Sequence, residues 1–184
     1  MTHKIYSLIG IDGFECVLPV DKKDYKALDF DGSPRISTWR PILMQLVNED
    51  TGQKRPSKKS DFPWQGTGQS LVLRKAALDA MRDILERSCE ILPLQTEDDS
   101  ELYITNTQVL QALDVDRSEI WRFPNSGKIM YVKRPHFMPH LLRDVDMFRD
   151  ASVGSETFVS EKFVQRYHDN KLRGLKFHEM QTLG

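Results

Sequence analysis

Two amphipathic helical segments, set among short strand-like runs, constrain the fold of this sequence more than any other feature. In the first, apolar residues fall at helical spacing while charged residues occupy the opposite face, which predicts a helix over about residues 75–88. The second follows Ser160, a good N-cap, with Glu161 in the first turn, where a carboxylate suits the helix dipole. Asn170 can close this helix, so it is expected over about residues 160–170.

Short strands account for most of the remaining apolar residues. Alternation and β-branched content predict strands over the following segments: residues 4–11, 15–20, a run after Pro41, 71–73, 91–94, 101–108, 126–137, 144–150 and 175–180. The order of strands, helix, strands, helix and strand indicates an α+β fold with a mostly antiparallel sheet and two main helices.

The first 70 residues have a less regular pattern than the rest. Residues 21–35 are polar and indicate a loop with one helical turn. Residues 51–69 combine three glycines, two prolines and four clustered cations, a composition typical of a linker. We therefore expect an N-terminal strand and loop region over residues 1–60, packed on an α+β domain over residues 61–184.

Composition excludes several classes of protein. The net charge of −1 provides no global field that would attract nucleic acid or anionic lipid, and no apolar run approaches the ~20 residues of a membrane span. The N-terminal stretch is too short and too polar for a secretion signal. Cys16 and Cys89 lie far apart without metal-type spacing, so reduced thiols in a cytoplasmic protein are the simplest interpretation.

No motif for catalysis, cofactor binding or metal binding stands out. The sequence contains no G-x-S-x-G, P-loop or G-x-G-x-x-G pattern, and its histidines never form an HxH or HExxH set. Neither cysteine has a nearby histidine in the sequence, and Cys89 is interpreted as a small core residue. We therefore expect no enzymatic activity, no cofactor and no metal.

The acidic stretch ALDVDRSEIW, residues 112–121, needs its own interpretation. As a calcium loop starting at Asp114 it lacks the glycine at position 6 and the carboxylate at position 12. A hydrolytic pair needs one carboxyl with a raised pKa, usually from burial, whereas Arg117 would keep its neighbours ionised. A turn or helix N-terminus, with Asp and Ser as capping residues, is the simplest interpretation.

Acidic residues are concentrated around this stretch. From Thr96 to Glu119 seven carboxylates stand against one arginine, a local balance of −6. Such a segment is either a solvated face or a docking surface for a basic partner, since complementary charge speeds association.

Three segments of the chain resemble a known family. They are EILPL at residues 90–94, NTQVLQALD at 106–114 with Ser118 and Glu119 after it, and FVSEKFV at 158–164 leading to LRGLKF. In this order and spacing they resemble the immunity protein family 11 domain of bacterial polymorphic toxin systems, formerly a domain of unknown function. The resemblance runs from about Trp39 to Phe177, and it departs from the family pattern at Arg74, where a serine that could cap the helix is often found.

The resemblance implies a cytoplasmic, non-enzymatic α+β protein. Such proteins neutralise a cognate toxin, encoded by an adjacent gene, through direct non-covalent binding, and the resemblance carries no catalytic residue to this chain. The sequence leaves a homo-oligomer open. The alternative is a stand-alone binding or regulatory module that contacts a peptide or small ligand through a sheet edge.

Eight residues are the candidates for contact with a toxin. The aromatic residues Trp121, Phe123 and Tyr131 flank the acidic segment and are candidate anchors, unless they belong to the core. Five carboxylates are candidates for steering a basic toxin: Asp98, Asp99, Asp114, Asp116 and Glu119.

Overall fold

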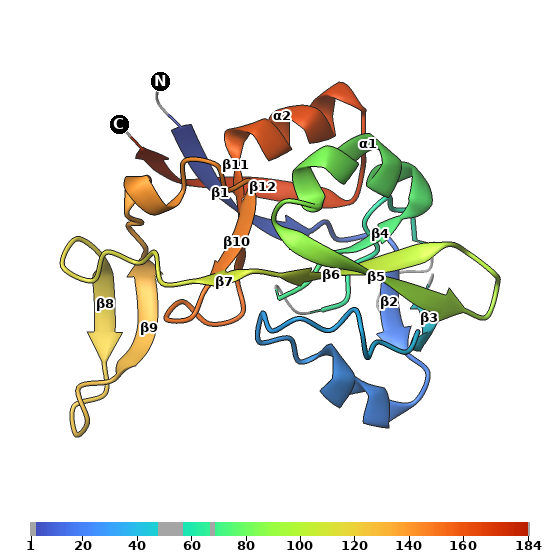
Figure 1. The fold of residues 1–184 in the computed structure, drawn as a ribbon, viewed down its shortest axis with the longest axis horizontal. Coiled ribbons are helices and arrows are strands. Elements are labelled where there is room, and N and C mark those ends of the chain that lie inside the picture. The colour runs from blue at the N-terminus through green and yellow to red at the C-terminus, as the bar shows by residue number, and fades with distance from the viewer. Residues whose placement is uncertain (1–2, 48–56, 67–68, 184) are drawn as a thin grey trace.

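The computed structural model describes residues 3–47, 57–66 and 69–183. Its strands form two five-stranded sheets and a separate two-stranded hairpin, and the two α-helices lie together on one side of the molecule (Figure 1). Two of the described strand pairs are parallel and the others are antiparallel. The predicted α+β class with a mostly antiparallel arrangement is therefore confirmed. No helix within the described ranges has the length and apolar character needed to cross a membrane.

The first sheet joins the two ends of the described chain. Its strand order is β12 (Leu175–Leu183), β1 (His3–Gly10), β11 (Thr157–Ser160), β10 (Met147–Asp150) and β7 (Val109–Leu110). The strand β1 is antiparallel to both β11 and β12, so the N-terminal strand is internal to this sheet. At the other edge, β7 runs parallel to β10.

The second sheet is built from the middle of the chain. Its order is β2 (Cys16–Pro19), β3 (Leu43–Val47), β5 (Cys89–Thr96), β6 (Leu102–Thr107) and β4 (Val72–Arg74). The β5–β6 hairpin is its most extensive pairing, and β3 runs parallel to β5. The apolar inner positions of this sheet pack with residues before β3, including Phe30 and Ile42.

The two helices share one core with both sheets. α1 (Lys75–Leu85) and α2 (Glu161–Asp169) each bury one apolar face, as their periodicity predicts. The buried residues of these two helices are Ala77, Leu78, Met81, Ile84, Leu85, Phe163 and Tyr167. They pack with Leu8 of β1 and Val159 of β11. The hydroxyl of Ser160 accepts a hydrogen bond from the Phe163 N–H at 3.2 Å, which confirms the predicted cap.

The third sheet is a hairpin of β8 (Glu119–Arg122) and β9 (Ile129–Arg134) that projects at the lower left of Figure 1. The prediction of a strand over residues 126–137 is confirmed for β9, whereas its partner β8 was not predicted as a strand. Two short 3₁₀ helices complete the fold: η1 (Lys22–Leu28) and η2 (Pro139–Leu141). The first is the helical turn expected within residues 21–35.

The first helix ends earlier than its periodicity predicts. It stops at Leu85, and the N–H of Ser88 donates to the Leu85 carbonyl at 2.8 Å in a turn. Ser88 is then used by other elements: its carbonyl accepts from the Gln108 N–H, and its hydroxyl accepts from the Met147 N–H at 3.2 Å. These contacts between distant segments override the helical pattern of residues 86–88.

The linker predicted over residues 51–69 is wrong for the part that the structure describes, residues 57–66. Phe62 is only 1% exposed and belongs to the core shared by the helices. Short bridges join Lys58 to Phe14 and Trp64 to Cys16, so this segment lies along β2. The rest of the predicted linker lies outside the described residues, except for Gln69.

Arg74 has a role that explains why no serine caps α1. The helix begins directly after Arg74, without a capping hydrogen bond from its side chain. The guanidinium instead donates through Nε to the buried Glu15 carboxylate at 3.2 Å and to the Ser60 carbonyl at 3.0 Å. Glu15 also accepts from the Ser60 N–H at 3.0 Å. This ion pair fastens β2 and the 57–66 segment to the start of α1.

Replacing Gly174 with alanine is expected to cost more than about 3 kcal/mol in the free energy of unfolding. Gly174 has a φ of +113°, and a Cβ at this position would overlap the buried Ser60 hydroxyl and approach the Phe62 carbonyl at 3.3 Å. Urea unfolding followed by circular dichroism would measure the loss.

The matched control is Gly154→Ala. Gly154 also has a positive φ, +82°, but a Cβ there would meet nothing within 4 Å. Gly154→Ala should therefore lower the free energy of unfolding only through backbone strain, by about 1 kcal/mol. Equal losses for the two variants would contradict the packing argument.

Candidate functional site

The structure divides the eight candidate residues into two groups. Asp98 and Asp99 lie at the tip of the β5–β6 hairpin, which is at the right of Figure 1. The other six lie between residues 114 and 131, at or beside the β8–β9 hairpin on the left. The carboxylates that were counted as one acidic segment of the sequence therefore belong to two separate surfaces.

At the right-hand tip, the carboxylates shape a turn. The Asp98 side chain accepts from the Ser100 hydroxyl at 2.9 Å and from the Ser100 N–H at 3.2 Å. These hydrogen bonds lower the pKa of Asp98. Asp99 has a φ of +55°, a conformation that Asp adopts more readily than most residues. This arrangement explains the residue types without a ligand.

The 114–118 segment is also a turn held by its own side chains. Asp114 Oδ1 accepts from the Arg117 N–H at 3.2 Å, and the Ser118 hydroxyl donates to the Asp114 carbonyl at 2.6 Å. This is the predicted use of Asp and Ser as capping residues. Across the described ranges, no group of three or more His, Cys, Asp and Glu side chains is placed to hold a metal ion.

Hydrogen bonds at its base fix the position of the β8–β9 hairpin. The Asp150 carboxylate at the end of β10 accepts from the backbone N–H groups of Ala112 and Leu113 at 2.7 and 2.9 Å. Leu113 in turn forms an isolated bridge with Phe137, which lies three residues after the end of β9. Both chains of the hairpin are therefore tied to the first sheet at their base.

The inner face of the hairpin is apolar and packs on this base. Ile120 pairs with Val132, and both contact a core cluster, together with Ile129. The cluster contains three phenylalanine rings in mutual contact: Phe137, Phe148 and Phe158. A two-stranded hairpin alone is marginally stable in water, so this packing maintains its shape.

The outer face carries exposed aromatic side chains. Trp121 and Tyr131 are cross-strand partners, and each is 56% exposed. Phe123 in the connecting turn is 48% exposed, and Met130 of β9 is also exposed. Of the four exposed aromatic residues in the described chain, only Tyr25 lies elsewhere. Large aromatics gathered on one protrusion are typical of a protein interaction site.

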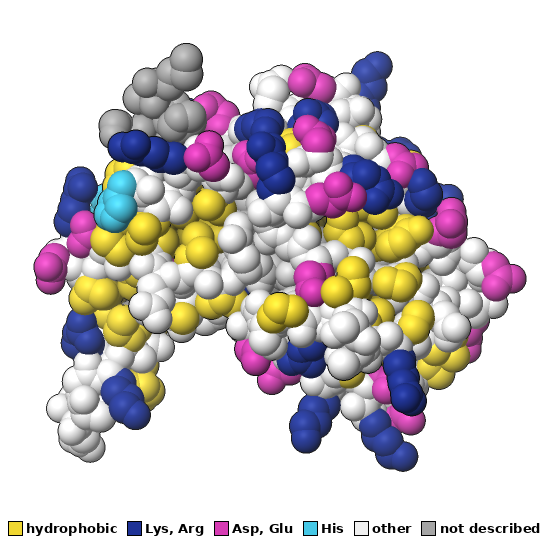
Figure 2. Space-filling view, in the orientation of Figure 1, with side chains coloured by type: hydrophobic (Ala, Val, Ile, Leu, Met, Phe, Trp, Pro, Cys, Tyr) yellow, Lys and Arg dark blue, Asp and Glu magenta, His cyan; other side chains and the backbone are white. Residues whose placement is uncertain are grey.

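The charges of the hairpin differ from those expected for the acidic segment. Glu119 accepts a hydrogen bond from Lys133 at 2.7 Å and lies 3.7 Å from Arg134, and the Lys133 contact lowers the pKa of Glu119. Residues 119–134 carry four cations and this one carboxylate, a formal charge of +3. On the face drawn in Figure 2, the lower end of the hairpin shows hydrophobic and basic side chains. The sequence pattern missed this because the cations follow the acidic run.

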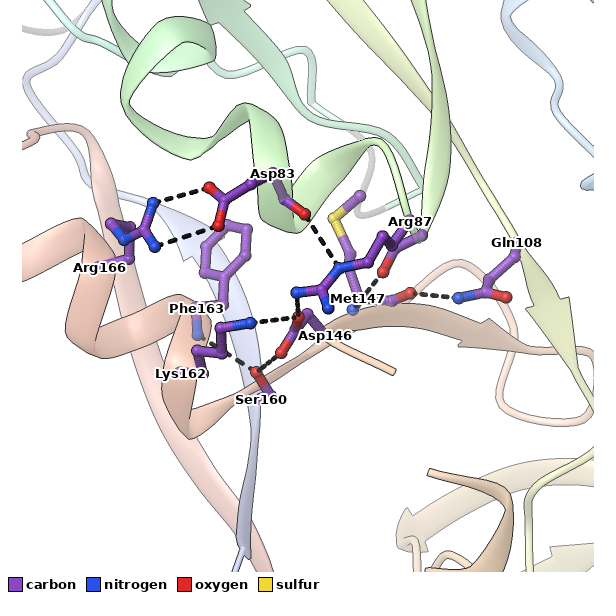
Figure 3. Close-up of polar contacts among 10 residues, drawn as sticks. Asp83, Arg87, Gln108, Asp146, Met147, Ser160, Lys162, Phe163 and Arg166 are labelled. Carbon is purple, nitrogen blue, oxygen red and sulfur yellow. Dashed lines mark hydrogen bonds and ion pairs between the residues drawn. The ribbon is translucent and has the colours of Figure 1, made fainter. Parts of the chain in front are cut away.

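A second polar cluster joins the two helices and contains two carboxylates, which a hydrolytic site would need (Figure 3). The buried Asp146 carboxylate accepts from the Ser160 hydroxyl at 2.8 Å, from Arg87 at 3.0 Å and from Lys162 at 3.3 Å. Beside it, Arg166 donates to Asp83 at 2.7 and 3.2 Å and thereby lowers the pKa of Asp83. Both carboxylates are engaged by cations.

This cluster is best explained as a structural connection. Arg87 follows α1, and Asp146 precedes β10. Ser160 is the N-cap of α2, and Lys162 lies in its first turn. A hollow of about 240 Å³ beside it is lined by three cations and three carboxylates, so the charges there balance. A hydrolytic site needs two carboxyls in unlike environments, whereas Asp146 and Asp83 both form ion pairs with cations.

The sequence model of the family described as Immunity protein family (Imm11) matches residues 89–182, just over half of the 184 residues. The chain belongs to this family. The match confirms the resemblance stated from the sequence, and it includes the β8–β9 hairpin and Asp146, but not Asp83 or Arg87. No curated protein matches the chain.

In this Imm11 family member, removal of the Asp146 carboxylate is expected to cost about 2 kcal/mol in the free energy of unfolding, because the partly buried Ser160 hydroxyl loses its acceptor. Arg87 and Lys162 are half exposed and would be hydrated again, which limits the loss. Urea unfolding of Asp146→Ala measures it. Asp144→Ala is the control, since Asp144 is exposed and should change stability by less than about 0.5 kcal/mol.

The thiol of Cys89 is expected to resist alkylation at pH 8. Burial raises its pKa to about 12, and Sγ donates to the Leu85 carbonyl at 3.2 Å, so the nucleophilic thiolate is a very small fraction. A Cys16→Ser variant isolates this thiol, since Cys16 and Cys89 form no disulfide. Iodoacetamide labelling followed by mass spectrometry should be slow in the folded protein and fast in urea. Rapid labelling of the folded protein would show that the thiol is accessible as thiolate.

Proposed function

We propose that this protein is a cytoplasmic immunity protein that neutralises a cognate bacterial toxin by direct non-covalent binding, and that the β8–β9 hairpin is central to the contact. The observation that carries the proposal is the exposure of Trp121, Phe123 and Tyr131 on one braced protrusion. It is supported by membership of the Imm11 family, whose match includes the hairpin.

The hairpin has the physical properties of a binding element. Tryptophan and tyrosine offer large contact areas with few rotatable bonds, and they dominate the energetics of many interfaces. Because Ile120 and Val132 hold the inner face on the core, the outer face keeps one shape before binding. A rigid surface loses little conformational entropy when a partner docks on it.

Neutralisation by this route requires no chemistry on the immunity protein. An interface of standard size covers ~800 Å² on each partner, which is enough to close an active site or cover an essential surface. The 114–118 turn lies beside the hairpin and would extend the contact area. We expect the toxin to be the product of an adjacent gene.

The proposal predicts that Trp121→Ala combined with Tyr131→Ala weakens toxin binding by at least about a hundredfold, as two truncated interface anchors would. Co-purification with the product of the adjacent gene, followed by calorimetric titration, would measure the loss. A toxin activity assay with equimolar immunity protein should show the same order of effect.

The matched control is Tyr25→Ala, which removes an exposed aromatic side chain from η1 on the other side of the molecule. It should bind the toxin as the unaltered protein does. The proposal fails if the unaltered protein leaves the toxin fully active at equimolar concentration. Unchanged affinity of a folded Trp121→Ala, Tyr131→Ala variant would instead remove the hairpin from the interface.

A further inference from the structure

We infer that the toxin surface facing the β8–β9 hairpin is acidic, with an apolar recess for the aromatic side chains; this inference rests on the proposed function. The hairpin carries a formal charge of +3 over residues 119–134, whereas the whole chain carries −1. The remainder of the chain therefore carries −4. The protrusion is a basic element on an otherwise acidic protein, which orients it toward negative charge on approach.

Arg122 and Lys128, the two cations nearest the tip of the hairpin, are available to interact with a partner. Within the described residues, neither Arg122 nor Lys128 forms an ion pair with a carboxylate. Arg122 donates through Nη1 to the Gly127 carbonyl at 2.9 Å, which holds the guanidinium against the turn while its other N–H groups remain free to donate. Lys133 and Arg134, by contrast, already interact with Glu119.

The neighbouring carboxylates do not reverse this sign. Glu119 forms ion pairs with Lys133 and Arg134. One carboxylate oxygen of Asp114 accepts a hydrogen bond from the Arg117 N–H within the turn. Taken from residue 114 to residue 134, five cations stand against three carboxylates, a formal charge of +2. The sequence-based expectation of a basic toxin counted Asp98 and Asp99, which lie at the other end of the molecule (Figure 1), and left out the four cations that follow Glu119.

An acidic protein surface fits the hairpin better than nucleic acid does. Aromatic side chains and cations also serve in single-stranded nucleic acid binding, where bases stack on the rings. Strong binding to the phosphate backbone, however, uses roughly 6–10 cation contacts. The hairpin offers two unpaired cations next to its aromatic residues, a number suited to the polar rim of a protein interface.

The test measures association rates with nuclease-treated toxin by stopped flow at low and physiological salt. Arg122→Glu combined with Lys128→Glu should slow association about tenfold at low salt, and the difference should shrink as salt is added. Lys22→Glu combined with Lys23→Glu is the matched control, because it makes the same change in net charge on exposed residues of η1. This control should change the rate by less than about twofold.

A second variant separates the two signs directly. Asp114→Lys combined with Asp116→Lys should speed association if the toxin face is acidic, and slow it if that face is basic. Faster association of the Arg122→Glu, Lys128→Glu variant, or slower association of the aspartate variant, would overturn the inference. So would a complex that forms only when nucleic acid is present.

The same experiment distinguishes this inference from the proposed function. If loss of Trp121 and Tyr131 abolishes binding while the charge variants leave the association rate unchanged, the function stands and the acidic partner surface is wrong. If the unaltered protein forms no complex with the toxin, the proposed function itself fails and the inference fails with it.

Discussion

The packing of three phenylalanine rings beneath the small hairpin is the interaction on which the candidate site depends. Phe137 contacts Phe148 and Phe158 edge-on, with ring centroids 5.1 and 4.8 Å away, and the latter two are 5.5 Å apart. The rings come from β10, β11 and the segment that follows β9. Because the cluster also receives Ile120 and Val132, burial of one hairpin face fixes the exposure of the other.

The charged groups of the molecule serve two different purposes. Asp146, Glu15 and Asp150 are buried, and each joins elements that are distant in the sequence through hydrogen bonds or ion pairs. The cations at the tip of the hairpin have no such partner among the described residues. Buried charge therefore maintains the scaffold, while the exposed charge beside the aromatics is the part left to select a partner in the proposed function.

Features that depend on local sequence were the ones that could be predicted. The apolar periodicity of α1 and α2, the Ser160 cap and the turn stabilised by Asp114 and Ser118 involve residues within a few positions of each other. Features that depend on distant partners were missed: the end of α1 at Leu85 and the packing of Phe62. In each case a contact with a remote segment decides the local conformation.

By itself, the sequence determined the fold class, the two helices, the family and the aromatic residues worth testing. The tertiary structure alone decided that Trp121, Phe123 and Tyr131 are exposed, and that Asp98 and Asp99 lie far from the hairpin. The physical reason is that local pattern sets which face of an element is apolar, whereas burial and summed charge depend on which segments the fold brings together. A run that is acidic along the chain can thus contribute to a surface that is basic in space.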